Sequence, residues 1–106
     1  MEQQTEQQDV PLSEPTLLTL VTGLAAQAMI SLGVFPNPAD GLTRILLHQG
    51  KHLIYTVAMI ADKTAGHQTP EEAKTIENVL HELRMIYIAA QDEKQKRDNG
   101  ENRVAP

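Results

Sequence analysis

The sequence predicts an all-α fold with three main helices, in which a long charge-free first helix packs on an antiparallel helical hairpin. Three observations support this prediction. Residues 15–39 contain no charged side chain, and the apolar residues in this window recur at helical spacing. A second pattern of the same period covers about residues 42–64. A compact turn signal at residues 64–72 then leads into a third pattern.

The first helix is expected to run from about Glu14 to Leu32. Ser13 is a suitable N-cap, and Gly33 is placed to end the helix in the left-handed conformation. On a helical wheel the apolar residues share one broad face, and small uncharged groups occupy the other. The apolar face consists of Leu17, Leu18, Val21, Leu24, Ala25, Ala28, Met29 and Leu32, with Leu20 at its edge. The opposite side contains Thr16, Thr19, Gly23, Gln27 and Ser31.

The lack of charge on this helix predicts that both of its faces are covered. Charged groups solvate well and are costly to bury, so an exposed helix face normally carries lysine or glutamate. The hairpin covers one side, and we expect the other side to meet a second copy of the chain in a homodimer. The predicted interface on this helix comprises Leu17, Leu20, Gly23, Leu24, Ala26, Gln27 and Ile30.

The connector and the second helix follow. Residues 35–41 have the prolines and glycine of an irregular connector, and Phe35 is expected to fold back as an apolar plug. The second helix should start near Asp40 or Leu42 and run to about Thr64. Gly50 lies on its apolar side, where a glycine costs about 1 kcal/mol relative to alanine. Two alternatives explain the glycine at this position. One is a close helix crossing or an interface at Gly50, and the other is drift at a weakly constrained position.

The turn between the second and third helices has the strongest local signal. Gly66 is a suitable C-cap, and Thr69 and Glu72 form a capping-box pattern around Pro70 at the first helical position. Because the loop is short, the two helices should pack as an antiparallel hairpin. The third helix is expected over residues 70–92, where apolar residues again recur at helical spacing.

The chain is expected to form one domain. Residues 13–92 form the helical domain, and residues 1–12 and 93–106 are expected to be disordered charged tails. The chain has no cysteine, which is compatible with a reducing compartment, and its N-terminus lacks the pattern of a signal peptide, so we expect a cytoplasmic protein. A net charge of −5 and only three aromatic residues argue against a nucleic-acid partner.

A membrane role is the alternative to self-association. The segment 17–35 is long and apolar enough to be considered for insertion into a bilayer. However, the helix is amphipathic, with a polar face of small uncharged groups, rather than apolar all round. The first cation after it is Arg44, so no basic flank anchors it. We therefore keep membrane association as the alternative and favour a soluble module.

Several segments resemble a known family. The pieces Asp62-Lys-Thr-Ala-Gly66, Thr69-Pro-Glu-Glu72 and Leu80-His-Glu-Leu-Arg-Met-Ile-Tyr87 follow a charge-poor helix and a Pro-x-Pro connector. Together they resemble the bacterial family catalogued as domain of unknown function 1844, over roughly residues 17–90. The chain departs from the family pattern at Ala65-Gly66-His67 and at His81. The resemblance implies a compact helical domain and no particular reaction.

Candidate metal ligands are sparse. His48 and His52 are four residues apart, a spacing that can place two imidazoles on one metal ion. They lie away from the apolar face of the second helix with Lys51 between them, and no carboxylate nearby in the sequence completes a site. We interpret them as surface histidines, with a metal site as the alternative. His81 and Glu82 begin a zinc-protease motif, but Met85 stands where its second histidine belongs.

Glu82 and Arg84 are the remaining candidate site residues. They flank Leu83, so at least one of them is expected at the border of the helix packing, where an arginine can pair with a carboxylate across an interface. Because no converging catalytic cluster is visible, we assign them to an interface. The sequence predicts no enzyme and no cofactor. It favours a helical interaction module that forms a homodimer and offers its remaining surface to another protein.

Overall fold

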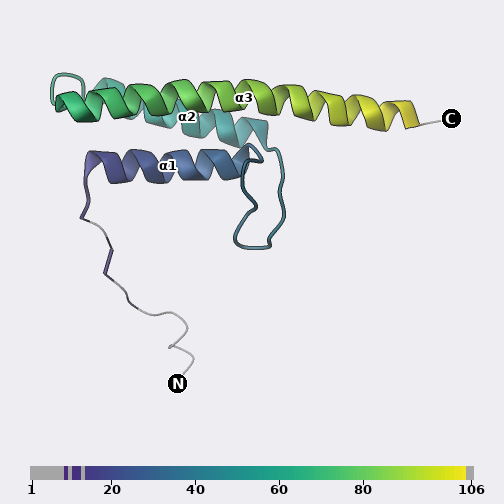
Figure 1. The fold of residues 1–106 in the computed structure, drawn as a ribbon, viewed down its shortest axis with the longest axis horizontal. Helices are drawn as coiled ribbons and strands as arrows, with labels where there is room; N and C mark the ends of the chain where they lie inside the picture. The colour runs from purple at the N-terminus through teal and green to yellow at the C-terminus, as the bar shows by residue number, and fades with distance from the viewer. Residues whose placement is uncertain (1–8, 10, 13, 105–106) are drawn as a thin grey trace.

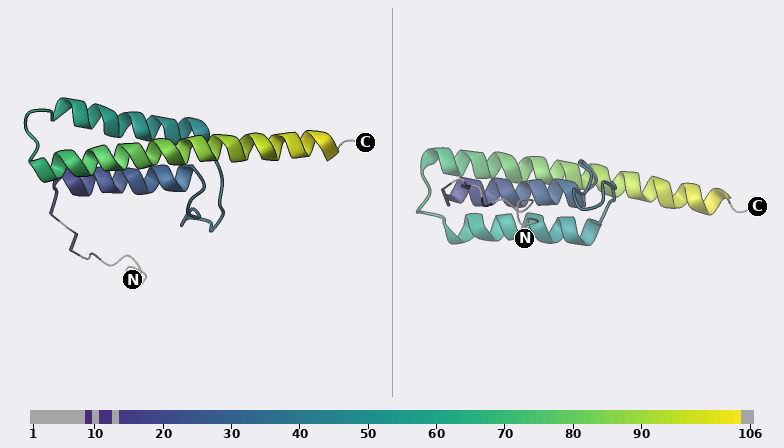
Figure 2. Two further views of the ribbon diagram at one scale, coloured as in Figure 1. Left: turned by 45° about the horizontal axis from the view of Figure 1, so that its top comes forward. Right: turned by 90° about the horizontal axis from the view of Figure 1, so that it is seen from below.

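The computed structural model describes residues 9, 11, 12 and 14–104, with side chains described as far as residue 100. It contains helices α1 (Leu17–Ser31), α2 (Leu47–Lys63) and α3 (Pro70–Val104), and no strand among these residues. Figure 1 shows that α2 runs back along α1 and that α3 runs forward again, so neighbouring helices in the chain are antiparallel. Each helix contacts both of the others, and the two views in Figure 2 show a three-helix bundle. The predicted all-α class is confirmed.

The core lies where the three helices meet. Val21, Val57 and Leu83, one from each helix, are its largest completely buried side chains. Most of the predicted apolar face of α1 is buried or half-buried in this core. The sequence predicts Ser31 on the opposite side, but it is buried where the start of α2 meets the end of α1. There its carbonyl oxygen accepts a hydrogen bond from the backbone N–H of Leu46, 2.7 Å away. Buried apolar residues here are Val21, Ala25, Ala28, Leu32, Ile45, Leu53, Ile54, Val57, Ile76, Leu80, Leu83 and Ala90.

Helix α1 starts later than predicted. Its N-cap is Thr16, whose hydroxyl accepts from the backbone N–H of Thr19 while the Thr19 hydroxyl accepts from the N–H of Thr16. This reciprocal pair satisfies two backbone donors and fixes the start of the helix. The predicted N-cap, Ser13, lies outside the described residues. At the other end, Gly33 has a φ of 84° directly after the C-cap Leu32, as predicted.

The predicted start of α2 at Asp40 or Leu42 is wrong, because residues 32–46 form a longer connector than expected. In its turn the backbone N–H of Asn37 donates to the carbonyl of Leu42 over 2.7 Å, and the N–H of Gly41 donates to the carbonyl of Asn37 over 2.6 Å. Gly41 has a φ of 73°. The predicted plug is also wrong, because Phe35 keeps 48 % of its surface exposed.

Gly50 marks a close contact between α1 and α2. A Cβ atom built on Gly50 would lie 2.7 Å from the Cγ atom of Leu32, well inside van der Waals contact. Packing within the chain therefore accounts for Gly50, and drift is not needed to explain it. Gly50 is buried within the single chain, and its predicted place in an interface between copies stays a prediction.

The hairpin turn has the predicted capping box. The N–H of Glu72 donates to the Thr69 hydroxyl over 3.0 Å, and the Glu72 carboxylate accepts from the N–H of Thr69 over 2.8 Å. Gly66 has a φ of 85° in the turn. The Gln68 side chain, which sequence reasoning did not single out, donates to the carbonyl of Ala61 near the end of α2.

Helix α3 does not end near Asp92 as predicted but continues to Val104. Its last turns project beyond α1 and α2 in Figure 1. Pairs four residues apart support this extension, because Lys96 bonds Asp92 and Arg97 bonds Glu93, each over 3.2 Å. The division of the chain into one domain and two tails stays a prediction.

The segment 17–35 is helical only as far as Ser31. Among the residues that the structure describes, no helix combines the length and the apolar character needed to cross a membrane.

Candidate functional site

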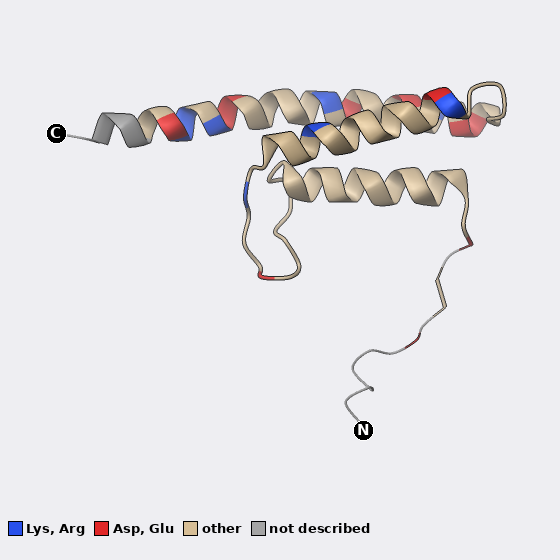
Figure 3. Cartoon of the chain, turned by 180° about the vertical axis from the view of Figure 1, so that it is seen from behind, with Lys and Arg blue, Asp and Glu red and all other residues tan. Residues whose placement is uncertain are grey.

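The side of α1 that faces away from the bundle is the most unusual surface of the chain. We call this surface the α1 outer face. Figure 3 shows that α1 carries no charged residue, whereas α2 and α3 do. Leu20 is 51 % exposed on it, and Gly23 and Ala26 lie at its centre. Its exposed residues are Thr19, Leu20, Thr22, Gly23, Ala26 and Gln27, and the half-buried Ile30 lies at its end.

The hydroxyl groups of this face are already hydrogen bonded to the helix itself. The Thr19 hydroxyl donates to the carbonyl of Thr16 over 2.9 Å, and the Thr22 hydroxyl donates to the carbonyl of Leu18 over 2.8 Å. Such bonds satisfy these hydroxyl donors within the helix itself. The face therefore presents few groups that need water.

The two glycines in α1 and α2 differ in what surrounds them. A Cβ atom on Gly50 would overlap Leu32, whereas a Cβ atom on Gly23 would meet no atom within 4 Å. Packing within the chain explains the glycine at position 50 but not the one at position 23, which lowers helix propensity by about 1 kcal/mol relative to alanine. Gly23 instead makes the outer face flat at its centre.

Four other residues of the predicted interface lie away from the α1 outer face. Leu17 and Leu24 are half-buried against the core rather than on the outer face. Glu82 and Arg84 are exposed on α3. No ion pair joins them to another described side chain.

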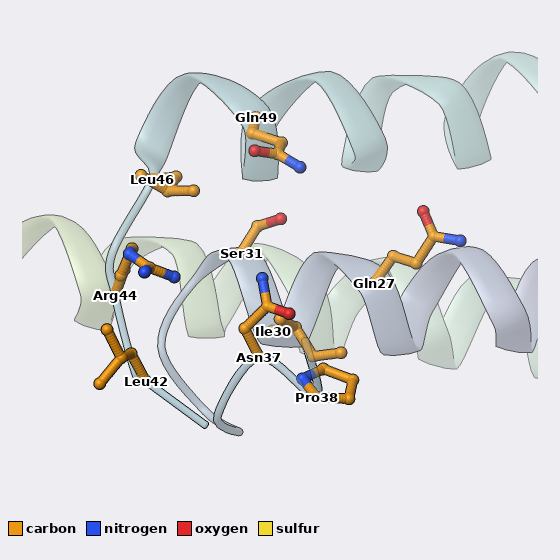
Figure 4. A pocket seen from close by; sticks show the side chains of 9 residues that line it. All are labelled: Gln27, Ile30, Ser31, Asn37, Pro38, Leu42, Arg44, Leu46 and Gln49. Atoms are coloured by element: carbon orange, nitrogen blue, oxygen red, sulfur yellow. The ribbon is translucent and has the colours of Figure 1, made fainter. Parts of the chain in front are cut away.

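A polar pocket lies at the end of the α1 outer face. We call it the connector pocket, and Figure 4 shows that its side chains come from α1, the connector and the start of α2. Its volume is about 240 Å³. Gln27 and Ile30 belong both to this pocket and to the outer face. Its lining residues are Gln27, Ile30, Ser31, Asn37, Pro38, Leu42, Arg44, Leu46 and Gln49.

One ion pair lies beside the connector pocket, between Arg44, which lines it, and Asp40, which does not. The Arg44 guanidinium donates to the Asp40 carboxylate, and this bond, together with the backbone N–H of Leu42, lowers the pKa of Asp40 below its usual value of 3.8. The same bond raises the pKa of Arg44. Sequence reasoning missed this pocket. The sequence feature that could have indicated the pocket is Arg44, which lines it and is the first cation after the charge-free window.

His48 and His52, the weak metal candidates, are both exposed on α2. Within the part of the chain that the structure describes, no three histidine, aspartate or glutamate side chains are grouped as metal ligands would be. The pair carries no further argument for a metal centre.

Fold and site together define a small all-helical protein, a three-helix bundle whose first helix has an uncharged outer face. The chain belongs to the family described as a domain of unknown function, DUF1844, whose profile matches residues 14–89. This match covers α1, the connector, α2 and most of the part of α3 that packs on them. No curated protein and no solved structure matches the chain.

Proposed function

We propose that this protein is a cytoplasmic interaction module that forms a homodimer through the α1 outer face, with a binding role rather than a catalytic one. The observation that carries the proposal is the uncharged, internally hydrogen-bonded surface of α1. The absence of cysteine is compatible with a reducing compartment and supports the cytoplasmic assignment.

The energetics of covering this face are favourable. Burying a charged side chain incurs a desolvation penalty that its new partners often fail to repay. The α1 outer face contains no such side chain, and its threonine hydroxyls keep their bonds to the helix when they are covered. Covering Leu20 removes exposed apolar surface from water, which favours association.

A two-fold contact between copies fits the layout of the face. In such a contact the same patch meets itself. Gly23 and Ala26 lie near the middle of α1, where the lack of large side chains lets two helices approach closely. If the helices cross in antiparallel fashion, the start of one α1 meets the end of the other. The partner then also covers Gln27 and Ile30 at the mouth of the connector pocket.

A matched pair of charge substitutions tests this proposal. Ala26 is exposed on the outer face, and Ala89 is an exposed alanine on α3. Sedimentation velocity of the full chain is expected to give a dimer for the wild type and for Ala89→Lys, and a monomer for Ala26→Lys. Circular dichroism should show the same helix content for both variants, because lysine is a good helix former.

Two results would contradict the proposal. One is a wild-type monomer at every concentration tested, and the other is an Ala26→Lys variant that stays dimeric. Gly23→Ala adds an independent readout, because the two states respond in opposite directions. In a monomer it should only stabilise α1, by about 1 kcal/mol, whereas in the dimer the added methyl group should weaken association.

A further inference from the structure

A second surface lies between α2 and α3. Here the two helices enclose a groove of about 320 Å³ to which α1 contributes no residue. We call it the hairpin groove. Its lining residues are Lys51, Ile54, Tyr55, Arg84, Tyr87 and Ile88.

The groove is mainly apolar. Ile54 is buried and Tyr87 half-buried, so these two connect the groove to the core. Tyr55 and Ile88 are 63 % and 57 % exposed, which leaves a large ring and a branched aliphatic chain in water. Large apolar side chains that are exposed together commonly mark a binding surface.

Two cations accompany these apolar residues. Lys51 and Arg84 are exposed, and neither forms an ion pair with another described side chain. No acidic residue lines the groove. In a chain with a net charge of −5, the groove is thus a local site of positive charge beside apolar surface.

We propose that the hairpin groove binds an acidic segment of a partner protein, one that carries apolar side chains next to carboxylates. The apolar side chains contact Tyr55 and Ile88. The carboxylates pair with Lys51 and with Arg84, whose planar guanidinium suits a bidentate pair. The groove shares no residue with the α1 outer face, so this proposal does not depend on the homodimer.

Charge complementarity favours an acidic protein segment over a membrane surface or a nucleic acid. The chain has 14 acidic residues against nine lysines and arginines, so its net negative charge would repel an extended anionic surface. A short peptide contacts only the groove, whose lining includes the two cations and no carboxylate. Attraction of this kind chiefly raises the association rate and the specificity of binding.

The chain contains its own reporter for this site. It has no tryptophan and only two tyrosines, Tyr55 and Tyr87, and both line the groove. The probe is a short acetylated and amidated peptide with two leucines one helical turn apart, glutamates beside them and no aromatic residue. Titrating this peptide into the full chain is expected to change the tyrosine emission and to saturate. Binding should weaken as salt is added.

Variants distinguish the groove from the rest of the surface. Lys51→Gln combined with Arg84→Gln should weaken binding about tenfold, and Ile88→Gln should also weaken it. Lys74→Gln removes an exposed charge from α3 outside the groove and should leave binding unchanged. All of these positions are exposed, so the variants should keep the wild-type melting temperature.

The proposal is overturned if the acidic peptide leaves the tyrosine emission unchanged, or if a twin peptide with lysines in place of glutamates binds equally well. It is also overturned if the Lys51 and Arg84 double variant binds like the wild type. A response to anionic phosphatidylserine vesicles without a response to the peptide would assign the groove to a membrane instead. The outcomes for Ala26→Lys and for the groove variants are read separately, so either proposal can fail alone.

Discussion

Replacing Gly50 with alanine is expected to destabilise the bundle, although alanine is the better helix former. Gly50 lies inside α2 and is buried against α1. The added Cβ atom would lie 2.7 Å from the Cγ atom and 3.3 Å from the Cδ1 atom of Leu32. Leu32 is only 3 % exposed and belongs to the core, so its side chain can move aside only by disturbing other core side chains. The clash must be relieved by displacing the Leu32 side chain, or the end of α1 that carries it, from its place in the core.

The magnitude follows from two opposing effects. Replacing glycine by alanine inside a helix gains about 1 kcal/mol, whereas forcing an extra carbon into a packed core costs roughly 1–3 kcal/mol. The expected net result is a loss of about 1 kcal/mol in the free energy of unfolding. Gly23→Ala is the matched control, because the same methyl group there meets no atom within 4 Å. It should gain about 1 kcal/mol.

Urea denaturation followed by circular dichroism measures both changes. Making the substitutions in an Ala26→Lys background removes the expected contribution of self-association. If Gly50→Ala stabilises the protein as much as Gly23→Ala does, the close packing of Gly50 on Leu32 is refuted. Leu32→Val should partly rescue Gly50→Ala, because the smaller side chain makes room for the added methyl group.

Two further predictions concern the caps and the connector. Thr69→Ala should cost about 1 kcal/mol of unfolding free energy in urea, because the N–H of Glu72 loses its acceptor; an unchanged midpoint would contradict the capping role. An NMR titration should give Asp40 a pKa below 3.8. Arg44→Gln should raise that pKa towards 3.8, because the hydrogen bond from Arg44 is the main cause of the lowering. Because the folded pKa is the lower one, the Asp40 carboxylate stabilises the fold above pH 3.8 and loses this effect as the pH falls through the folded pKa. Asp40 is exposed, so the pH effect on stability should be small, and an unchanged pKa in Arg44→Gln would refute the pairing.

The three helices and the hairpin turn could be predicted from the sequence because their signals are local. Apolar spacing identified the buried face of α1, and Thr69 and Glu72 carried the capping box within four residues of chain. Interactions of this kind depend on neighbours in the sequence, so one sequence contains enough information to place them.

The start of α2 could not be predicted in the same way. Leu42, Ile45 and Leu46 have helical spacing, but only Ile45 is buried. The connector is held instead by a hydrogen bond from Leu46 to Ser31, a contact between segments that are distant in the sequence. Tertiary contacts of this type override a local pattern, and no spacing rule reveals them.

The end of α3 was missed for a different reason. The sequence after Asp92 has no apolar stripe, and the loss of this pattern predicts that the helix ends there. Ion pairs one turn apart, such as Lys96 with Asp92, support a helix without any buried face. The connector pocket and the hairpin groove were missed as well, because both combine residues from separate elements.

The central claim is that the α1 outer face is covered by a second copy of the chain. Light scattering coupled to size-exclusion chromatography, run on the full chain over a dilution series without detergent, tests it most directly. The account predicts a molar mass of twice the 11.7 kDa of one chain, which falls towards that of a single chain only at high dilution. A molar mass of one chain throughout the series would contradict it.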